Sequence, residues 1–114
     1  MGFTAATRYV GDVVIVDLAG PLTLGEGSGT LRETVKGLIE KGDRKILLKL
    51  QHVTKIDSSG LAELVSSHAS AVRASANVKL LNVDTKVESL LVMTKLSTVF
   101  ESFNSEAIAL ISFS

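Results

Sequence analysis

The sequence has no cysteine and a single proline among its 114 residues. Without cysteine there is no disulfide framework, thiolate metal site or cysteine nucleophile, and this composition fits a reducing cytoplasm. The lone proline, Pro21, follows Gly20, and the pair predicts a turn.

Neither sign of charge is in excess, because 12 Lys and Arg residues balance 12 Asp and Glu residues. Without a basic excess we expect no direct binding of nucleic acid. Apolar runs such as Val13–Val16 and Leu90–Met93 are too short to span a bilayer. The N-terminal residues lack the pattern of a signal peptide, and Ala6 stands where myristoylation requires Ser or Thr. We therefore expect a cytoplasmic protein that does not bind membranes.

The alternation of short strands with amphipathic helices predicts an α/β domain. Apolar periodicity places strands at residues 3–9, 13–19, 46–50, 78–83 and 99–103. Helical patterns cover residues 31–40, 61–72, 85–91 and 105–111. Gly11-Asp12 joins the first two strands as a hairpin. We expect residues 1–114 to form a single domain with a mixed, mostly parallel sheet, opened by this hairpin and packed by about four helices.

Local signals add detail to three of these helices. Gly42 is expected to end the first helix, and Thr85 with Glu88 is the pattern of a capping box. The second helix is expected to bury one stripe, made of Leu61, Leu64, Val65, His68, Ala69 and Val72.

The most informative motif is Asp57-Ser58-Ser59-Gly60-Leu61, where a buried strand segment meets an amphipathic helix. Sites in α/β folds gather at such strand ends. Ser58 or Ser59 is suited to cap the helix, and Asp57 to fix the turn. Free N–H groups and the helix dipole favour an anion at this point. The fold would therefore tolerate a phosphoryl group on Ser58, which would add a charge of about −1.5 to −2 at the surface, the kind of change that a binding switch requires.

Other interpretations of these segments remain open. The motif also suits an ordinary turn between a strand and a helix. A receiver-like domain with Asp57 as phosphoacceptor would need a further acidic pair for Mg²⁺, which Asp12 and Asp17 do not provide at their positions. Residues 25–30 resemble a phosphate-binding loop but lack its lysine, so they predict a flexible loop available to a partner.

No catalytic constellation is visible in the sequence. The Gly-x-Ser-x-Gly elbow of serine hydrolases is absent, and His52 has no neighbouring residue of a metal-ligand type. His68 lies on an apolar stripe and is expected to be a half-buried histidine with satisfied hydrogen bonds. We therefore expect neither enzymatic activity nor a cofactor or metal.

Taken together, these segments resemble STAS domains, specifically bacterial anti-sigma factor antagonists, over essentially the whole chain. The resemblance rests on the hairpin, the Gly20–Thr23 turn, the Lys45–Leu50 strand, the Asp57–Leu61 motif and the Val78–Val83 strand.

The resemblance implies a switch between partners. In that family, the serine that follows the aspartate is phosphorylated by a partner that is both an anti-sigma factor and a kinase. By motif position this serine is Ser58, with Ser59 as the fallback. The resemblance implies that the unphosphorylated chain binds the kinase and frees a sigma factor. A metal-dependent serine phosphatase would reset the switch, and ATP would belong to the kinase.

We expect the partner-binding surface to contain Thr23, Gly25, Ser28 and Ser58. The alternative is a STAS scaffold or adaptor that does not switch, in a stress-sensing or transporter complex. A serine at the acceptor position favours switching. The modest apolar excess leaves room for a weak homodimer.

Overall fold

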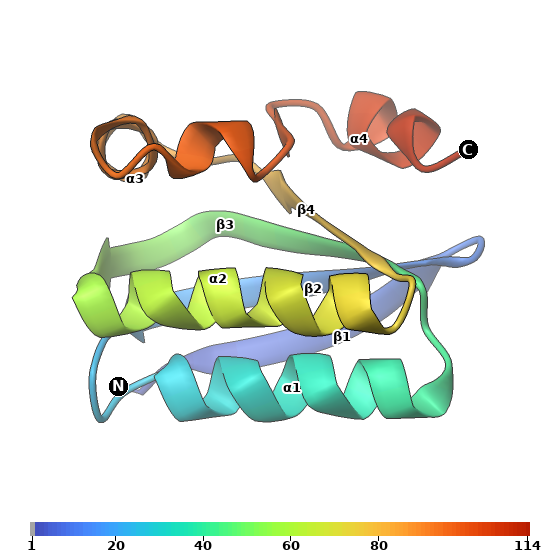
Figure 1. Cartoon of the computed structure of the whole chain (residues 1–114), viewed down its shortest axis with the longest axis horizontal. Coiled ribbons are helices and arrows are strands. Elements are labelled where there is room, and N and C mark those ends of the chain that lie inside the picture. Colours follow the sequence, from blue (N-terminus) through green and yellow to red (C-terminus); the bar gives the residue numbers. More distant parts are fainter. Residues whose placement is uncertain (1) are drawn as a thin grey trace.

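One mixed sheet with helices on both of its faces makes up the part of the chain that the computed structural model describes, residues 2–114 (Figure 1). The strands are β1 (Thr4–Val10), β2 (Val13–Leu22), β3 (Lys45–Ile56), β4 (Asn77–Leu81) and β5 (Ser102–Phe103). The helices are α1 (Ser28–Lys41), α2 (Ser58–Arg73), α3 (Thr85–Met93) and α4 (Glu106–Ser112), with a 3₁₀ turn, η1, at Leu96–Thr98.

The strand order is the order of the chain, β1-β2-β3-β4-β5. β1 pairs with β2 in antiparallel fashion, and every later neighbour pair is parallel. The predicted α/β fold, with a mostly parallel sheet opened by a hairpin, is confirmed. Gly11 has a φ of 61° at the first turn position of that hairpin, a conformation that glycine adopts without strain.

Two hydrophobic clusters hold the layers together. α1 and α2 lie side by side over one face of the sheet, and both follow the same direction (Figure 1). The larger cluster joins this face to α1, α2 and α3, and includes Val14, Leu48, Leu80, Leu31, Leu64 and Leu91. The smaller cluster joins the opposite face to α4, and includes Ile15, Leu47, Leu81, Ala109 and Phe113. Because both faces of β2 and β3 are covered near their starts, these segments are almost continuously apolar.

The predicted turn at Gly20–Thr23 is wrong, because β2 continues to Leu22 and pairs there with Ile56. The ladder between β2 and β3 shifts register between Gly20 and Pro21. A strand accepts proline at such an interruption, where a missing N–H removes no regular ladder hydrogen bond. The Gly20-Pro21 pair, which we interpreted as a turn, therefore marks an irregularity within β2.

β3 is also longer than the strand predicted at residues 46–50. β4 pairs with it only from Lys45 to Lys49, whereas β2 accompanies β3 as far as Ile56. Only Val53 is buried between residues 51 and 55, so the apolar run that marked the strand stops at Leu50. The extension carries the end of β3 to the same edge of the sheet as the end of β2.

The ends of the helices only partly follow the expected signals. Gly42 ends α1 with a φ of 103°, as predicted. The capping box at Thr85 and Glu88 is wrong, because Asp84 precedes Thr85 and its carboxylate accepts a hydrogen bond from the Val87 N–H at 2.9 Å. Asp84 and Thr85 are both favourable N-cap residues, and Asp84 occupies the N-cap position of α3.

The shorter elements near the C-terminus also differ from the prediction. The strand expected at residues 99–103 is reduced to Ser102–Phe103, which follow η1. The helix expected at 105–111 forms as α4, and Ser105 caps it by accepting a hydrogen bond from the Ile108 N–H at 3.3 Å.

The buried stripe of α2 is rotated relative to the prediction. Val72 is 59% exposed, whereas Glu63 and Ser67 are buried. Glu63 faces α1, where Arg32 donates two hydrogen bonds to its carboxylate at 2.9 and 3.0 Å. α2 thus packs on α1 as well as on the sheet. The apolar stripe in its sequence predicts only the contact with the sheet. A paired carboxylate can be buried because its hydrogen bonds are satisfied.

The N-terminal end of α2 packs very closely against β2 at Gly60. A Cβ atom at this position would overlap the carbonyl group of Leu22 and lie 3.0 Å from a side-chain carbon of Ile56. Gly60 therefore sets the distance between the first turn of α2 and the ends of β2 and β3.

We predict that Gly60→Ala lowers the free energy of unfolding by about 1–3 kcal/mol, because the added methyl group overpacks this contact. Gly37→Ala is the matched control, since Gly37 also lies in a helix but has open space at its Cβ position. It should raise the free energy of unfolding by about 0.5–1 kcal/mol. Urea unfolding of the three proteins tests this, and equal effects of the two substitutions would contradict the close contact.

Candidate functional site

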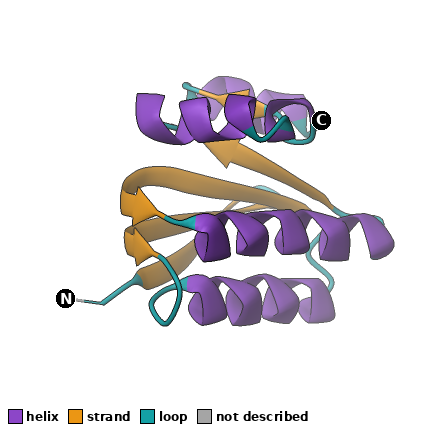
Figure 2. Ribbon diagram, turned by 60° about the vertical axis from the view of Figure 1, so that its left-hand side comes forward, coloured by secondary structure: helices purple, strands orange, loops and turns teal. Residues whose placement is uncertain are grey.

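The ends of β2 and β3 and the beginnings of α1 and α2 meet at one edge of the domain (Figure 2). In α/β folds this edge, at the carboxyl ends of parallel strands, is where functional residues gather. All residues predicted from sequence to bind a partner or accept a phosphate lie in the segments that meet here.

A tight turn connects β2 to α1. The Thr23 N–H donates to the Glu26 carbonyl at 2.7 Å, and the Glu26 N–H donates to the Thr23 carbonyl at 3.0 Å. Gly25 occupies the third position with a φ of 77°, as a type II turn requires. The flexible loop expected at residues 25–30 is therefore wrong, because the turn is hydrogen-bonded and α1 already begins at Ser28.

The Asp57 carboxylate joins this turn to the first turn of α2. One oxygen, Oδ1, accepts a hydrogen bond from the Gly60 N–H at 2.9 Å and so caps α2. The other, Oδ2, accepts a hydrogen bond from the Leu24 N–H at 3.0 Å. The expectation that Ser58 or Ser59 caps the helix is wrong, whereas the turn-fixing role expected for Asp57 is confirmed.

These hydrogen bonds stabilise the ionised form of Asp57. The bond from the Gly60 N–H, followed by the bond from the Leu24 N–H, lowers the pKa of the carboxyl group below its ordinary value. The carboxylate is therefore charged over the whole physiological pH range, and both of its oxygens are already engaged by backbone N–H groups.

With Asp57 as the cap, the serine that follows it is left at the surface. Ser58 is the first residue of α2 and is exposed, while Ser59 is half-buried. Gly60 is buried against β2, and Leu61 is a half-buried residue that packs against the larger hydrophobic cluster. Among the residues of the motif that carry a hydroxyl group, Ser58 is thus the more accessible to an enzyme.

The structure adds one residue to this edge that the sequence analysis missed. Leu24 occupies the second position of the turn, with its backbone N–H held by Asp57 and 77% of its surface exposed. The sequence signal that could have identified it is a single large apolar residue in the glycine-rich stretch from Gly20 to Gly29. Thr23 and Gly25 flank it in the same turn, and Ser28 begins the neighbouring helix.

The other residues considered from sequence lie away from this edge. His68 is half-buried in α2, with its ring 5.4 Å from that of Phe100 in an edge-to-face arrangement. Among residues 2–114 its buried Nδ1 atom has no hydrogen-bond partner, which differs from the expectation of a satisfied histidine. His52 is exposed on β3. Within residues 2–114, no three His, Asp or Glu side chains are grouped closely enough to hold a metal ion.

We predict that Asp57→Asn lowers the free energy of unfolding at neutral pH, because an amide oxygen replaces only one of the two acceptors. The folded-state pKa of Asp57 is lowered, so its contribution is complete above the unfolded pKa of about 3.9 and is lost as the pH falls through the folded pKa. Urea unfolding from neutral to acidic pH should show the difference from wild type shrinking toward acid.

Asp84→Asn is the matched control for this prediction. Asp84 also caps a helix, but its carboxylate accepts only the Val87 N–H among the described hydrogen bonds. Asparagine caps helices about as well as aspartate, so stability should change little. Equal losses in the two variants, or an Asp57→Asn difference that persists in acid, would contradict the double acceptor role.

Comparison with known proteins identifies the family. The model of the STAS domain matches residues 4–109. A solved structure from Thermotoga maritima, described as a candidate anti-sigma factor antagonist, is 26% identical and superposes with a TM-score of 0.87 over 95% of this chain and 92% of its own. No curated protein sequence matches significantly.

Two more distant structures share the fold. The phosphorylated form of SpoIIAA, a cell fate determinant from Bacillus, is 17% identical with a TM-score of 0.74 over 99% of this chain and 100% of its own. A sulfate transporter family protein from Wolinella succinogenes is 18% identical with a TM-score of 0.72 over 92% of this chain and 87% of its own. Among the helices of residues 2–114, none has the length and apolar character needed to cross a membrane. The family model, which matches nearly the whole chain, shows that the chain belongs to the STAS domain family.

Proposed function

We propose that this STAS domain is an anti-sigma factor antagonist, which binds a serine kinase that is also an anti-sigma factor and thereby frees a sigma factor. Phosphorylation of Ser58 switches the binding off. The observation that carries the proposal is the exposed position of Ser58 at the start of α2, beside a turn that Asp57 holds in place. The similarity to the Thermotoga maritima protein and to SpoIIAA supports the same function.

The position of Ser58 suits a phosphate on physical grounds. The first turn of a helix presents free N–H groups and the positive end of the helix dipole, both of which favour an anion. Because Ser58 is exposed and does not cap the helix, its modification removes no hydrogen bond that holds the domain together. The added charge of about −1.5 to −2 therefore acts on a partner and leaves the packing unchanged.

The recognition surface that we propose consists of Thr23, Leu24, Gly25, Ser28 and Ser58. Leu24 supplies an apolar contact, and a large exposed apolar side chain beside a charge switch is the kind of residue that anchors an interface. A phosphate on Ser58 would enter this surface, where like charges across an interface cost enough to lower affinity about a hundredfold or more.

In this scheme the chain is a ligand and a substrate, and it catalyses no reaction itself. The kinase transfers the γ-phosphoryl group of its own ATP to the Ser58 hydroxyl and releases ADP, so the domain requires no cofactor. A metal-dependent serine phosphatase hydrolyses the phosphate and returns the chain to its binding form. The protein acts in the cytoplasm and does not contact nucleic acid directly.

We predict that incubation with ATP and the cognate kinase adds one phosphoryl group to the peptide that contains Ser58. Ser58→Ala should abolish this modification, whereas Ser59→Ala, the matched control, should retain it. Ser58→Asp should weaken kinase binding while leaving the free energy of unfolding within about 0.5 kcal/mol of wild type. Intact-mass measurement, peptide mapping and a binding titration provide the three readouts.

Two outcomes would count against the switch. Kinase affinity that is equal for Ser58→Asp, for the phosphorylated chain and for wild type would contradict the charge mechanism. Complete absence of modification by an active, authenticated kinase, combined with stable incorporation into a multiprotein assembly, would favour a STAS scaffold or adaptor that does not switch.

We also predict that Leu24→Ala weakens kinase binding about tenfold, the loss typical of a central apolar contact. Val72→Ala is the matched control, because Val72 is 59% exposed but lies near the opposite end of α2. Calorimetric titration of both variants with the kinase tests this. Equal affinities for Leu24→Ala and wild type would remove the turn from the recognition surface.

A further inference from the structure

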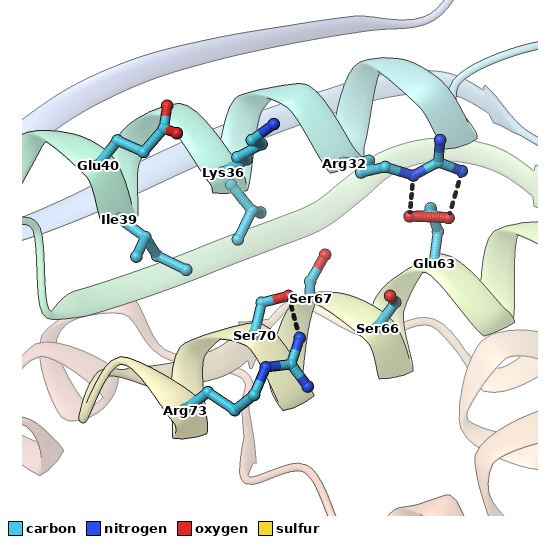
Figure 3. A pocket seen from close by; sticks show the side chains of 10 residues that line it. Arg32, Lys36, Ile39, Glu40, Glu63, Ser66, Ser67, Ser70 and Arg73 are labelled. Atoms are coloured by element: carbon cyan, nitrogen blue, oxygen red, sulfur yellow. Dashed lines mark hydrogen bonds and ion pairs between the residues drawn. The ribbon is translucent and has the colours of Figure 1, made fainter.

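A hollow of about 300 Å³ lies between α1 and α2, and its lining extends from Arg32 and Glu63 at one end to Glu40 and Arg73 at the other (Figure 3). Val35 and Ile39 of α1 form its apolar side, and α2 contributes Ser66, Ser67 and Ser70. Because serines are too small to fill the space between two packed helices, the helices leave this volume open. A volume of this size is at the lower end of the range for small-molecule sites.

Ser67 is an unusual residue for such an interface. It is only 4% exposed, and its hydroxyl oxygen is buried without a hydrogen-bond partner within the described residues. In Figure 3 the Ser67 side chain points from α2 toward α1, across the hollow. An unpaired buried hydroxyl is costly unless something supplies its partner, so this group points to a ligand in the hollow.

Cationic side chains from both helices line the same space. Lys36 of α1 and Arg73 of α2 line the hollow, and Arg73 donates a hydrogen bond to the Ser70 hydroxyl at 3.2 Å. The ion pair between Arg32 and Glu63, with a closest N–O distance of 2.9 Å, lies at the opposite end (Figure 3).

The two acidic residues that line the hollow, Glu40 and Glu63, do not neutralise all of this positive charge. Glu63 is already paired with Arg32, so the remaining charged groups of the lining are Lys36, Arg73 and the single carboxylate of Glu40. These three carry a net positive charge, which favours an anion in the hollow.

We propose that this hollow binds a small amphipathic carboxylate of the medium-chain fatty acid type. Its carboxylate lies between Lys36 and Arg73 and accepts a hydrogen bond from the Ser67 hydroxyl. Its apolar chain packs against Val35 and Ile39. The proposal does not depend on the switch at Ser58, since none of these residues belongs to the Asp57–Leu61 motif.

Titration of the complete chain with decanoate, below its micellar concentration, tests the proposal by amide NMR. Saturable shifts should be confined to α1 around Lys36 and to α2 around Ser67 and Arg73. Ser67→Ala should weaken binding about tenfold, the loss of a hydrogen bond to a charged group, without lowering the stability of the domain. Ser70→Leu should abolish binding by filling the hollow.

The role of charge is tested by two further comparisons. Lys36→Gln should weaken decanoate binding by about two- to fivefold, whereas Lys86→Gln, an exposed lysine on α3, should have no effect. Decanol should bind more weakly than decanoate. The proposal is overturned by shifts that do not saturate or that centre on α3 or α4, by equal binding of decanol, or by unchanged affinity in both Ser67→Ala and Ser70→Leu.

Discussion

One carboxylate sets the geometry of the candidate site. Asp57 stands where β3 ends, and its two oxygens accept hydrogen bonds from the Leu24 N–H and the Gly60 N–H. The first bond fixes the turn between β2 and α1, and the second starts α2. Because Gly60 then contacts the end of β2 directly, the two helix–strand junctions form a single unit. Ser58, the next residue, is exposed at this edge of the domain, where the hydrogen bonds of Asp57 hold the backbone in place.

This arrangement separates the interior of the domain from the edge that we propose as its signalling surface. The two hydrophobic clusters lie on the two faces of the sheet and contain neither Ser58 nor Leu24. A charge added at Ser58 therefore meets solvent or a partner and not the core. The proposed switch requires no change of fold, because the effect of the phosphate falls on the affinity for the partner.

The sequence predicted the layers of the fold better than the hydrogen bonds of the site. Alternating apolar patterns and Gly42 were sufficient for the order of elements, because they reflect burial and local backbone conformation. Competition between adjacent capping residues was not predictable: Asp57 and Asp84 took positions that Ser58 and Thr85 also suit.

Features that depend on packing between helices, or on turns, were missed for a different reason. Glu63 and Ser67 are buried because α2 packs against α1. Leu24 is exposed because it lies in the hydrogen-bonded turn between Thr23 and Glu26. The periodicity of one segment carries no information on either. The hollow beside Ser67 was therefore visible only once the two helices were placed side by side.

Amide hydrogen exchange in the wild type and in Asp57→Ala tests the central claim most directly. If the carboxylate couples the turn to the helix, protection of the Leu24 and Gly60 amides should fall together in the variant, by more than that of the buried β3 amides of Leu47 and Leu48. Unchanged protection at Leu24, with loss at Gly60 alone, would show that Asp57 only caps α2. The turn would then be independent of the switch residue.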